Sequence, residues 1–292
     1  MTRASYRRTI IAMDTFVTIE VPGHDANDEA VEPAFAWFAE IESHCSRFDP
    51  QSELRQLIGH AGETIPVSVV LFEAVRFSLA LAEQTDGAFD PTVGRSMEKQ
   101  GFNREYQTGK YIDSGINTES PVSFRDVILD PERLTITLKR PLVLDLGAVA
   151  KGLAVDLAAR ELLKFRNYMV DAGGDVYLAG HNAAGTSWNV GIPDPRHEGQ
   201  LLHTIPVSNA AVCTSGDYER GKHIIDARTN KPITGVASAT VIAPTAMLAD
   251  GLATAAFVLG PEAGLELLET AEVQGLIVTS ELEQFTTRGF PA

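Results

Sequence analysis

The residues best suited to chemistry in this sequence are two oxygen donors on a predicted helix near the C-terminus. Asp250 and Thr254 are four positions apart, so a helix places a carboxylate and a hydroxyl on one face. With a backbone carbonyl and phosphate oxygens they suit Mg²⁺, a hard cation that takes few carboxylates. A helix N-terminal acid and a threonine packed by its methyl group need no ligand at all. The apolar residues around Asp250 favour a functional role, because an unpaired buried charge is costly.

His223 is the second candidate, and it lies in the segment GKHIIDART with Asp226 three positions further on. Histidine titrates near neutrality and can accept a proton from a hydroxyl nucleophile. A structural histidine in a strand is the alternative interpretation. Because side chains alternate along a strand, His223 and Asp226 face opposite sides unless the strand bends, so no direct pair is assumed.

Two glycine-containing stretches supply further candidates. Asp145 lies in an apolar stretch that indicates a buried strand, and Lys151 follows it after a glycine turn. This spacing fits a site for a charged ligand, although a plain strand–helix–strand unit explains it too. In the loop DGAFDPTVG, Phe89 and Asp90 are suited to stack on and hydrogen-bond a planar heterocycle. A rigid turn explains the same loop.

The elements that must position these residues are predicted from hydrophobic periodicity and turn signals. Helices are expected at residues 27–44, after Pro50, from Ser68 to Asp86, from Val149 to Leu162 or Leu163, at 245–259 and after Pro261. Strands are expected at 10–21, 134–138, 142–146, 168–171, 176–179, 187–192, 201–207, 210–213, 222–226, 239–243, 275–279 and 283–287. Residues 101–125 are interpreted as a surface excursion. Many strands with helices that do not strictly alternate favour an α+β architecture.

Composition limits the possible classes of function. A chain of 292 residues, 44% hydrophobic and 22% charged, is typical of a soluble globular protein with one large domain or two closely joined ones. Its net charge of −15 disfavours nucleic acid as a partner. We predict no secretory signal, no transmembrane segment and a cytoplasmic location. Cys45 and Cys213 have no metal-type spacing and are expected to be buried free thiols.

Signatures of P-loop, dinucleotide-binding, zincin and α/β-hydrolase proteins are absent from the sequence. Eight segments, in order along nearly the whole chain, instead resemble the FAD:protein FMN transferases. This is the ApbE flavin transferase family, formerly called thiamine biosynthesis lipoproteins. The segments are MDTFVTIEV, CSRFDPQSEL, DGAFDPTVG, LDLGAVAKGLAVD, DAGGDVYLAG, WNVGIPDP, TSGDYERGKHIIDARTNKP and ADGLATAAFVLG.

The resemblance implies an α+β, ApbE-like (T-fold-related) fold of mixed sheets with packed helices. It implies a single domain, or two closely packed subdomains with the FAD site between them. The implied reaction is a Mg²⁺-dependent transfer of the FMN half of FAD to a Thr or Ser hydroxyl, with release of AMP. The implied acceptor is a flavoprotein subunit of an electron-transfer complex.

By position, the resemblance also implies roles for single residues. The implied FAD contacts are Met13, Ala88, Phe89, Asp90, Asp145, Lys151 and Ile224. The implied metal ligands are the carbonyl of Ala148 and the side chains of Asp250 and Thr254, and His223 is the implied base that deprotonates the acceptor hydroxyl. The chain departs from the family pattern at Asp14, where glycine is usual, and at Ala227 and Asn230, where proline and glycine are usual.

Two other functions stay open at the level of the sequence. An FAD pyrophosphatase would use the same metal site with water as the nucleophile and would give FMN and AMP. A non-catalytic flavin-binding protein of the same fold is a second alternative. The presence of His223, Asp250 and Thr254 disfavours that second alternative.

Overall fold

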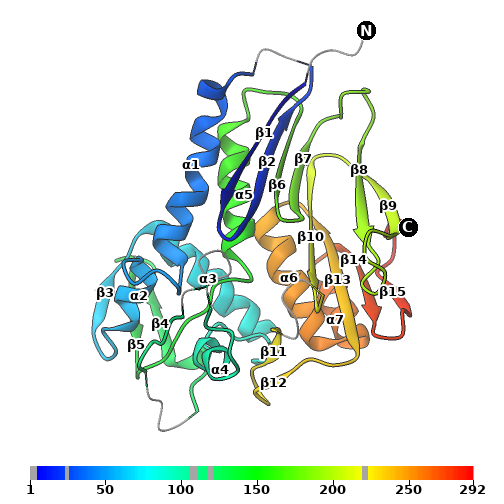
Figure 1. The fold of residues 1–292 in the computed structure, drawn as a ribbon. Coiled ribbons are helices and arrows are strands. Elements are labelled where there is room, and N and C mark those ends of the chain that lie inside the picture. The colour runs from blue at the N-terminus through cyan, green and yellow to red at the C-terminus, as the bar shows by residue number, and fades with distance from the viewer. Residues whose placement is uncertain are drawn as a thin grey trace. The chain divides into compact units, whose positions relative to one another are not determined.

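The computed structural model describes residues 5–23, 26–104, 109, 111–116, 121–218 and 223–291. Figure 1 shows their helices and strands, and the predicted α+β class is confirmed. The chain divides into two compact units. The first unit comprises residues 1–39, 151–221 and 234–292, and the second comprises residues 40–150 and 222–233.

The first unit is built on an eight-stranded sheet with the strand order β1-β2-β6-β7-β10-β13-β14-β15 (Figure 1). Neighbouring strands in it pair antiparallel. The strands are β1 Tyr6–Ala12, β2 Thr15–Val21, β6 Tyr168–Ala172, β7 Asp175–Ala179, β10 Ala210–Gly216, β13 Val236–Ala243, β14 Gln274–Thr279 and β15 Gln284–Thr286. The strands predicted in these regions from β6 onward are therefore confirmed.

The prediction of one strand over residues 10–21 is wrong, because the chain folds back there as the β1–β2 hairpin. Ala12 pairs with Thr15, and the turn residues Met13 and Asp14 have φ values of 49° and 59°. Two left-handed residues in a two-residue turn match the right-handed twist of a hairpin. Glycine enters this conformation freely and aspartate tolerates it, which explains how Asp14 can stand where the family usually has glycine.

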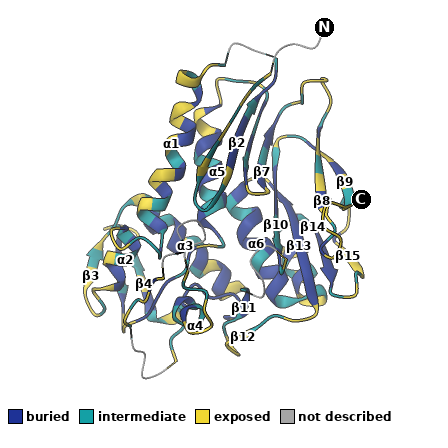
Figure 2. Cartoon of the chain, in the orientation of Figure 1, coloured by how far each residue is buried: buried dark blue, intermediate teal, exposed yellow. Residues whose placement is uncertain are grey.

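Helices and a hairpin cover opposite faces of this sheet. On one face, α6 (Ala246–Leu259) packs against β10 and β13, and α7 (Pro261–Thr270) packs against β14. On the other face, the hairpin of β8 (Trp188–Pro193) and β9 (Leu201–Val207) closes an apolar core. All eight residues of β13 are buried, as the dark blue strand in Figure 2 shows. β13 is therefore covered on both faces of the sheet.

Two further helices, α1 and α5, belong wholly or partly to the first unit. The predicted first helix is confirmed as α1 (Asp28–Cys45), which passes from the first unit into the second. Val31, Phe35, Phe38 and Ile41 recur at helical spacing along it and are all buried. The helix predicted from Val149 is confirmed as α5 (Ala150–Glu161), and small residues form much of its buried face. Small residues such as Ala154 and Ala158 are fully buried, whereas Leu163 is 73% exposed.

The second unit holds a three-stranded sheet in the order β3-β5-β4 and three α-helices among its described residues. The strands are β3 Thr64–Pro66, β4 Val127–Asp130 and β5 Thr135–Leu138, and a short pair is formed by β11 Ile225–Asp226 and β12 Lys231–Pro232. The helices are α2 Glu53–Ile58, α3 Val69–Gln84 and α4 Gly94–Lys99, with a 3₁₀ turn η1 at Phe124–Asp126. The helix predicted from Ser68 is confirmed as α3, and Ser68 caps it, since its Oγ accepts a hydrogen bond from the Leu71 amide at 3.1 Å.

Several predictions fail in this unit. Residues 142–146 form no strand beyond a single bridge between Val93 and Val143, because this buried segment bonds to loops instead. The strand expected at 222–226 spans only Ile225–Asp226, so His223 precedes it, and Lys222 lies outside the described residues. The segment 101–125, predicted to be a surface excursion, runs into η1 at its end. Its residues 105–108, 110 and 117–120 lie outside the described residues.

Both cysteines are buried free thiols, as predicted. Within the ranges that the structure describes, no helix combines the length and the apolar character needed to cross a membrane. The expected cytoplasmic location stays a prediction.

Candidate active site

In the first unit, a lysine lies between two buried carboxylates. The ammonium of Lys151 contacts Asp175 Oδ2 directly and lies 3.7 Å from Asp250 Oδ2. Asp175 and Asp250 are 2% and 4% exposed. Burial alone would lower the pKa of Lys151, but the two carboxylates outweigh it and raise the pKa above its ordinary value. The ammonium therefore stays charged, and the predicted FAD contact Lys151 and the predicted metal ligand Asp250 belong to one cluster.

The packing of α5 against the start of α6 positions Asp250. A Cβ atom added at Gly152 would lie 2.4 Å from the carbonyl oxygen of Ala246, so the two helices meet backbone to backbone there. The Asp156 carboxylate accepts hydrogen bonds from the amides of Ala246 at 2.7 Å and Met247 at 2.9 Å. Asp250 follows one turn later and accepts the Gly152 amide at 3.2 Å. The start of α6 is thus held against α5 by hydrogen bonds to Asp156 at one point and from Gly152 at another.

Thr254, the second predicted metal ligand, lies on the same face of α6 as Asp250, as predicted. Its Oγ1 is 2.9 Å from Ser215 Oγ on β10. Two positions before that serine, the thiol of Cys213 is fully buried and lies 3.5 Å from the Ala246 carbonyl oxygen. Burial, with the nearby carboxylates of Asp175 and Asp250, raises the pKa of Cys213 well above its ordinary value. The thiol stays protonated and is a poor nucleophile.

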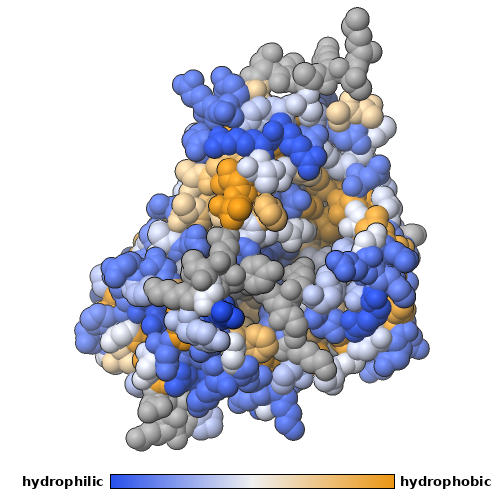
Figure 3. Space-filling view, in the orientation of Figure 1, coloured by the Kyte–Doolittle hydropathy of each residue, from blue (hydrophilic) through white to orange (hydrophobic). Residues whose placement is uncertain are grey.

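The turn that carries Met13 adjoins the glycine corner that leads to Asp175. The amide of Gly173 donates to the Phe16 carbonyl at 3.1 Å, and a Cβ atom at Gly173 would lie 2.2 Å from Thr15 Oγ1. Only glycine fits this contact, because φ at Gly173 is also left-handed at 66°. Ile11 and Phe16, which pair across the hairpin, are 63% and 68% exposed, and Figure 3 shows apolar surface over the β1–β2 hairpin.

In the second unit, the loop after α3 holds Asp90 in one orientation. Asp90 Oδ1 accepts from the amide and the hydroxyl of Thr92, both at 2.8 Å, and Oδ2 accepts from the Phe124 amide at 2.8 Å. Burial raises the pKa of Asp90, although these donors oppose the rise. Phe89 is 7% exposed and its amide donates to Thr85 Oγ1 at 3.1 Å. The rigid turn considered from the sequence is confirmed, and the contact of Phe89 and Asp90 with FAD stays a prediction.

Backbone hydrogen bonds join this loop to the segments of Asp145 and His223. The Asp145 amide donates to the Pro91 carbonyl at 2.7 Å, and the Ala227 amide donates to the Ala88 carbonyl at 3.2 Å. A proline at position 227 would lack that amide donor, so the departure from the family pattern adds a bond. Asn230 has a φ of 55°, a left-handed conformation that asparagine tolerates where glycine is usual.

One arginine that the sequence analysis did not single out, Arg47, connects the segments that carry Asp145 and His223. Arg47 is 4% exposed, and its Nε donates to Asp145 Oδ2 while its Nη2 donates to the Phe102 carbonyl at 2.5 Å. The Phe102 ring meets the His223 ring edge to face, with 6.3 Å between centroids and 67° between planes. Arg47 lies in CSRFDPQSEL among polar residues, where an exposed arginine is the ordinary expectation.

The predicted site residues thus fall into two groups, one in each unit. The first unit holds Met13, Lys151, Asp250 and Thr254, and the second holds Ala88, Phe89, Asp90, Asp145, Ala148, His223 and Ile224. The joint use of Ala148 with Asp250 and Thr254 as metal ligands stays a prediction. Among the described residues, no three His, Cys, Asp or Glu side chains gather closely enough to hold a metal ion. A metal here would need carbonyl, hydroxyl or substrate oxygens as well, which are the donors Mg²⁺ prefers.

Buried charged groups clustered in this way are typical of enzyme active sites. The model of the ApbE family matches residues 13–277. A Haemophilus influenzae protein named FAD:protein FMN transferase is 31% identical over 290 residues, which cover 91% of this chain and 83% of that protein. A Vibrio cholerae protein of the same name is 32% identical over 265 residues, covering 84% of this chain and 78% of its own length.

Solved structures agree with these sequence matches. The crystal structure of the ApbE protein from Thermotoga maritima superimposes with a TM-score of 0.86 at 30% identity, covering 98% of this chain and 97% of that one. The flavin transferase ApbE from Vibrio cholerae gives the same TM-score at 27% identity, with 98% of each chain covered. The chain belongs to the ApbE family.

Proposed function

We propose that this chain is an FAD:protein FMN transferase. It transfers the FMN half of FAD to a Thr or Ser hydroxyl of an acceptor protein and releases AMP. The observation that carries the proposal is the pair of the buried Asp250 and the partly buried Thr254 on α6, with Lys151 beside Asp250, in a chain of the ApbE family. The names of the matched relatives support the same activity.

The chemical step needs a base and a leaving group. The acceptor hydroxyl oxygen attacks the FMN phosphorus of FAD, the bond from that phosphorus to the bridging oxygen breaks, and AMP leaves. We assign His223 as the base that takes the hydroxyl proton, because a hydroxyl is a feeble nucleophile at neutral pH. The edge-to-face contact with Phe102 limits the orientations of the His223 ring.

The metal side of the proposal uses oxygen donors. Asp250, Thr254 and the carbonyl of Ala148 would hold Mg²⁺, which supplies charge neutralisation for the pyrophosphate and the departing AMP. The donor set fits this ion, because a carboxylate, a hydroxyl and a carbonyl are all hard oxygen ligands. Asp250 is held in place for this role by the Gly152 amide.

The remaining assigned residues bind FAD. The proposed contacts are Met13, Ala88, Phe89, Asp90, Asp145, Lys151 and Ile224. Met13 and Lys151 belong to the first unit, and the other five belong to the second. We propose an electron-transfer flavoprotein subunit as the acceptor, in line with the resemblance stated for the sequence.

An FAD pyrophosphatase is the alternative function, with water in place of the acceptor hydroxyl. The two activities separate when the protein is incubated with FAD, Mg²⁺ and a candidate threonine-containing acceptor. The proposal predicts AMP release together with acceptor mass increased by that of FMN minus water. Release of free FMN and AMP with an unmodified acceptor would favour the pyrophosphatase.

A further inference from the structure

We propose that Arg47 is a positioning residue of this site. Its guanidinium orients Asp145 and, through the Phe102 carbonyl, the ring against which His223 packs. The inference rests on the proposed function for the meaning of Asp145 and His223. The contacts that carry it lie within the second unit and are independent of that function.

The guanidinium uses two of its three nitrogens to join separate segments. Nε donates to Asp145 Oδ2, and Nη2 donates to the Phe102 carbonyl at 2.5 Å. The sequence separation of Arg47 from these partners is 98 and 55 residues, so the two hydrogen bonds connect distant parts of the chain. Hydrogen bonds of this charge-assisted kind are shorter and stronger than neutral ones. One rigid, planar group therefore sets the position of both partners.

The third nitrogen argues against a purely structural role. Arg47 Nη1 is buried and has no hydrogen-bond partner among the described protein atoms. A buried donor without an acceptor costs about 1–3 kcal/mol, and the arginine itself is only 4% exposed. This cost lowers the net stability that Arg47 can add to the fold. Its hydrogen bonds to Asp145 and Phe102 explain a buried arginine at this position better than a gain in core stability does.

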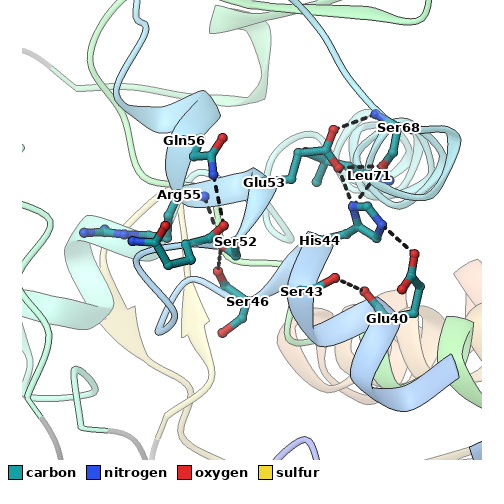
Figure 4. Close-up of polar contacts among 11 residues, drawn as sticks. Glu40, Ser43, His44, Ser46, Ser52, Glu53, Arg55, Gln56, Ser68 and Leu71 are labelled. Atoms are coloured by element: carbon teal, nitrogen blue, oxygen red, sulfur yellow. Dashed lines mark hydrogen bonds and ion pairs between the residues drawn. The ribbon is translucent and has the colours of Figure 1, made fainter. Parts of the chain in front are cut away.

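A tightly hydrogen-bonded turn presents Arg47. Ser46 Oγ accepts the amides of Phe48 at 3.1 Å and Asp49 at 3.2 Å, and Ser52 Oγ donates to the Ser46 carbonyl at 2.5 Å. Figure 4 shows Ser46 and Ser52 on this turn. The backbone on both sides of Arg47 is fixed by these bonds, so its side chain starts from a defined point.

A histidine cluster fixes the helices on either side of the turn. His44, near the end of α1, has Nδ1 2.6 Å from Glu53 Oε2 on α2 and Nε2 3.1 Å from Glu40 Oε1. Ser68, the cap of α3, donates from Oγ to Glu53 Oε2 at 2.5 Å (Figure 4). Three helices thus converge on one carboxylate, and the turn between α1 and α2 has little freedom to shift.

The other end of the connection is also anchored. The Phe102 amide donates to the Met97 carbonyl at 2.9 Å, which ties this residue to α4. Its carbonyl points to Arg47 and its ring meets His223. Removing the guanidinium would release the carbonyl, and the ring would change its position relative to the histidine.

A double-mutant cycle tests whether Arg47 acts through Asp145. Arg47→Met, Asp145→Asn and the double variant are compared for FAD affinity by flavin fluorescence and for AMP release in the presence of Mg²⁺. We expect Arg47→Met to reduce kcat/KM about ten- to hundredfold, the range for losing a hydrogen bond to a charged group. The double variant should lose no more than the worse single variant. Arg47→Lys, which keeps the charge but not the fork, should recover part of the loss.

Arg76→Met is the matched control. Arg76 is on α3 with a side chain 53% exposed, and it forms an ion pair with Glu73 one helical turn earlier. The same chemical change there should leave FAD affinity and turnover unchanged. Near-identical losses in Arg47→Met and Arg76→Met, or losses that simply add in the cycle, would overturn the inference.

A measurement without substrate separates this inference from the proposed function. In protein labelled with ¹³C-histidine, the His223 imidazole signal is assigned by its loss in His223→Gln. The ring current of Phe102 acts on this signal, so we expect Arg47→Met to shift it and Arg76→Met to leave it in place. An unchanged His223 signal in folded Arg47→Met would refute the inference even if transfer activity is found. Failure of the wild type to transfer FMN would refute only the function.

Discussion

At the scale of single residues, the candidate site depends on charges that are buried but shared. Asp250 accepts an amide and lies 3.7 Å from the Lys151 ammonium, whose other partner is Asp175. A neighbouring ammonium of this kind offsets part of the cost of burying a carboxylate. The sequence indicated the importance of Asp250 through its apolar neighbours. It did not show that Asp175 joins the same cluster, because a Gly-Gly-Asp corner is common in proteins.

Replacing Asp250 tests the metal assignment. Asp250→Asn keeps the size and one acceptor oxygen but removes the charge that Mg²⁺ needs. We expect Mg²⁺-dependent AMP release to fall on the order of 10³-fold, as loss of several kcal/mol of charge stabilisation implies. FAD binding, measured by fluorescence, should be largely retained. Undiminished Mg²⁺-dependent turnover in this variant would show that Asp250 is not a ligand.

His223→Ala tests the base. We expect FMN transfer to slow by about 10²–10⁴-fold with little change in FAD affinity, because general-base catalysis contributes within this range. The readout is the initial rate of acceptor flavinylation over a range of pH. The wild-type rate should rise with pH as the histidine loses its proton, and the variant should lose that rise. A variant that keeps both the rate and the pH profile would contradict the assignment.

At the scale of elements, the sequence predicted which helices and strands exist better than it predicted how they pack against one another. Alternation and caps located most strands and the helices α1, α3 and α6. Hydrophobic periodicity indicates only part of the buried face of α5. The helix also buries Ala154, Ala158 and Gly152, and small residues allow a backbone approach that hydrophobicity patterns do not reveal. The β1–β2 turn was missed because Met13-Asp14 lacks the glycine that usually signals a two-residue hairpin turn.

The contact of α5 with α6 gives a test at this scale. In Gly152→Ala, the new Cβ atom would lie 2.4 Å from the Ala246 carbonyl oxygen, so backbone must shift. We expect a loss of about 1–3 kcal/mol in the free energy of unfolding, typical of overpacking. Turnover should fall as well, because Asp250 accepts the amide of the same glycine.

Gly59→Ala is the control for this change. Gly59 has a right-handed φ of −70°, and its nearest neighbour to a new Cβ atom is 3.3 Å away. Urea unfolding should show little change for this variant. Equal stability of Gly152→Ala and the wild type would mean that the two helices are not in such close contact.

At the scale of the whole molecule, the fold keeps its two thiols neutral. Burial, with a contribution from Glu53, raises the pKa of Cys45 to about 12, whereas a cysteine in the unfolded chain titrates near 8.5. The folded state therefore binds this proton more tightly than the unfolded state does. The stabilisation is complete below the unfolded pKa and is lost as pH rises through the folded pKa.

We therefore expect the free energy of unfolding to fall between about pH 8.5 and 12. Cys45 should contribute up to about 1.4 kcal/mol per pH unit in this window. Urea denaturation at pH 7.5 and pH 10 measures the effect, and Cys45→Ala should show a smaller decline than the wild type. An equal decline in the two proteins would contradict the raised pKa of this thiol.

The family could be recognised from ordered segments of the sequence, and its fold and most of its strands followed. What could not be predicted were the contacts made by distant residues, such as Arg47 with Asp145, because pairing across the chain depends on the tertiary structure. The departures at Asp14 and Asn230 are now explained by left-handed backbone that both residue types tolerate.

The most direct test of the account measures the stoichiometry of the reaction. The protein is mixed with FAD, Mg²⁺ and an acceptor flavoprotein subunit, and the AMP formed is compared with the flavin attached to the acceptor by mass spectrometry. We predict one attached FMN for each AMP released. When the acceptor threonine is replaced by valine, we predict neither AMP release nor attached FMN. AMP release that is independent of that threonine, with no flavin on the acceptor, would contradict the proposed function.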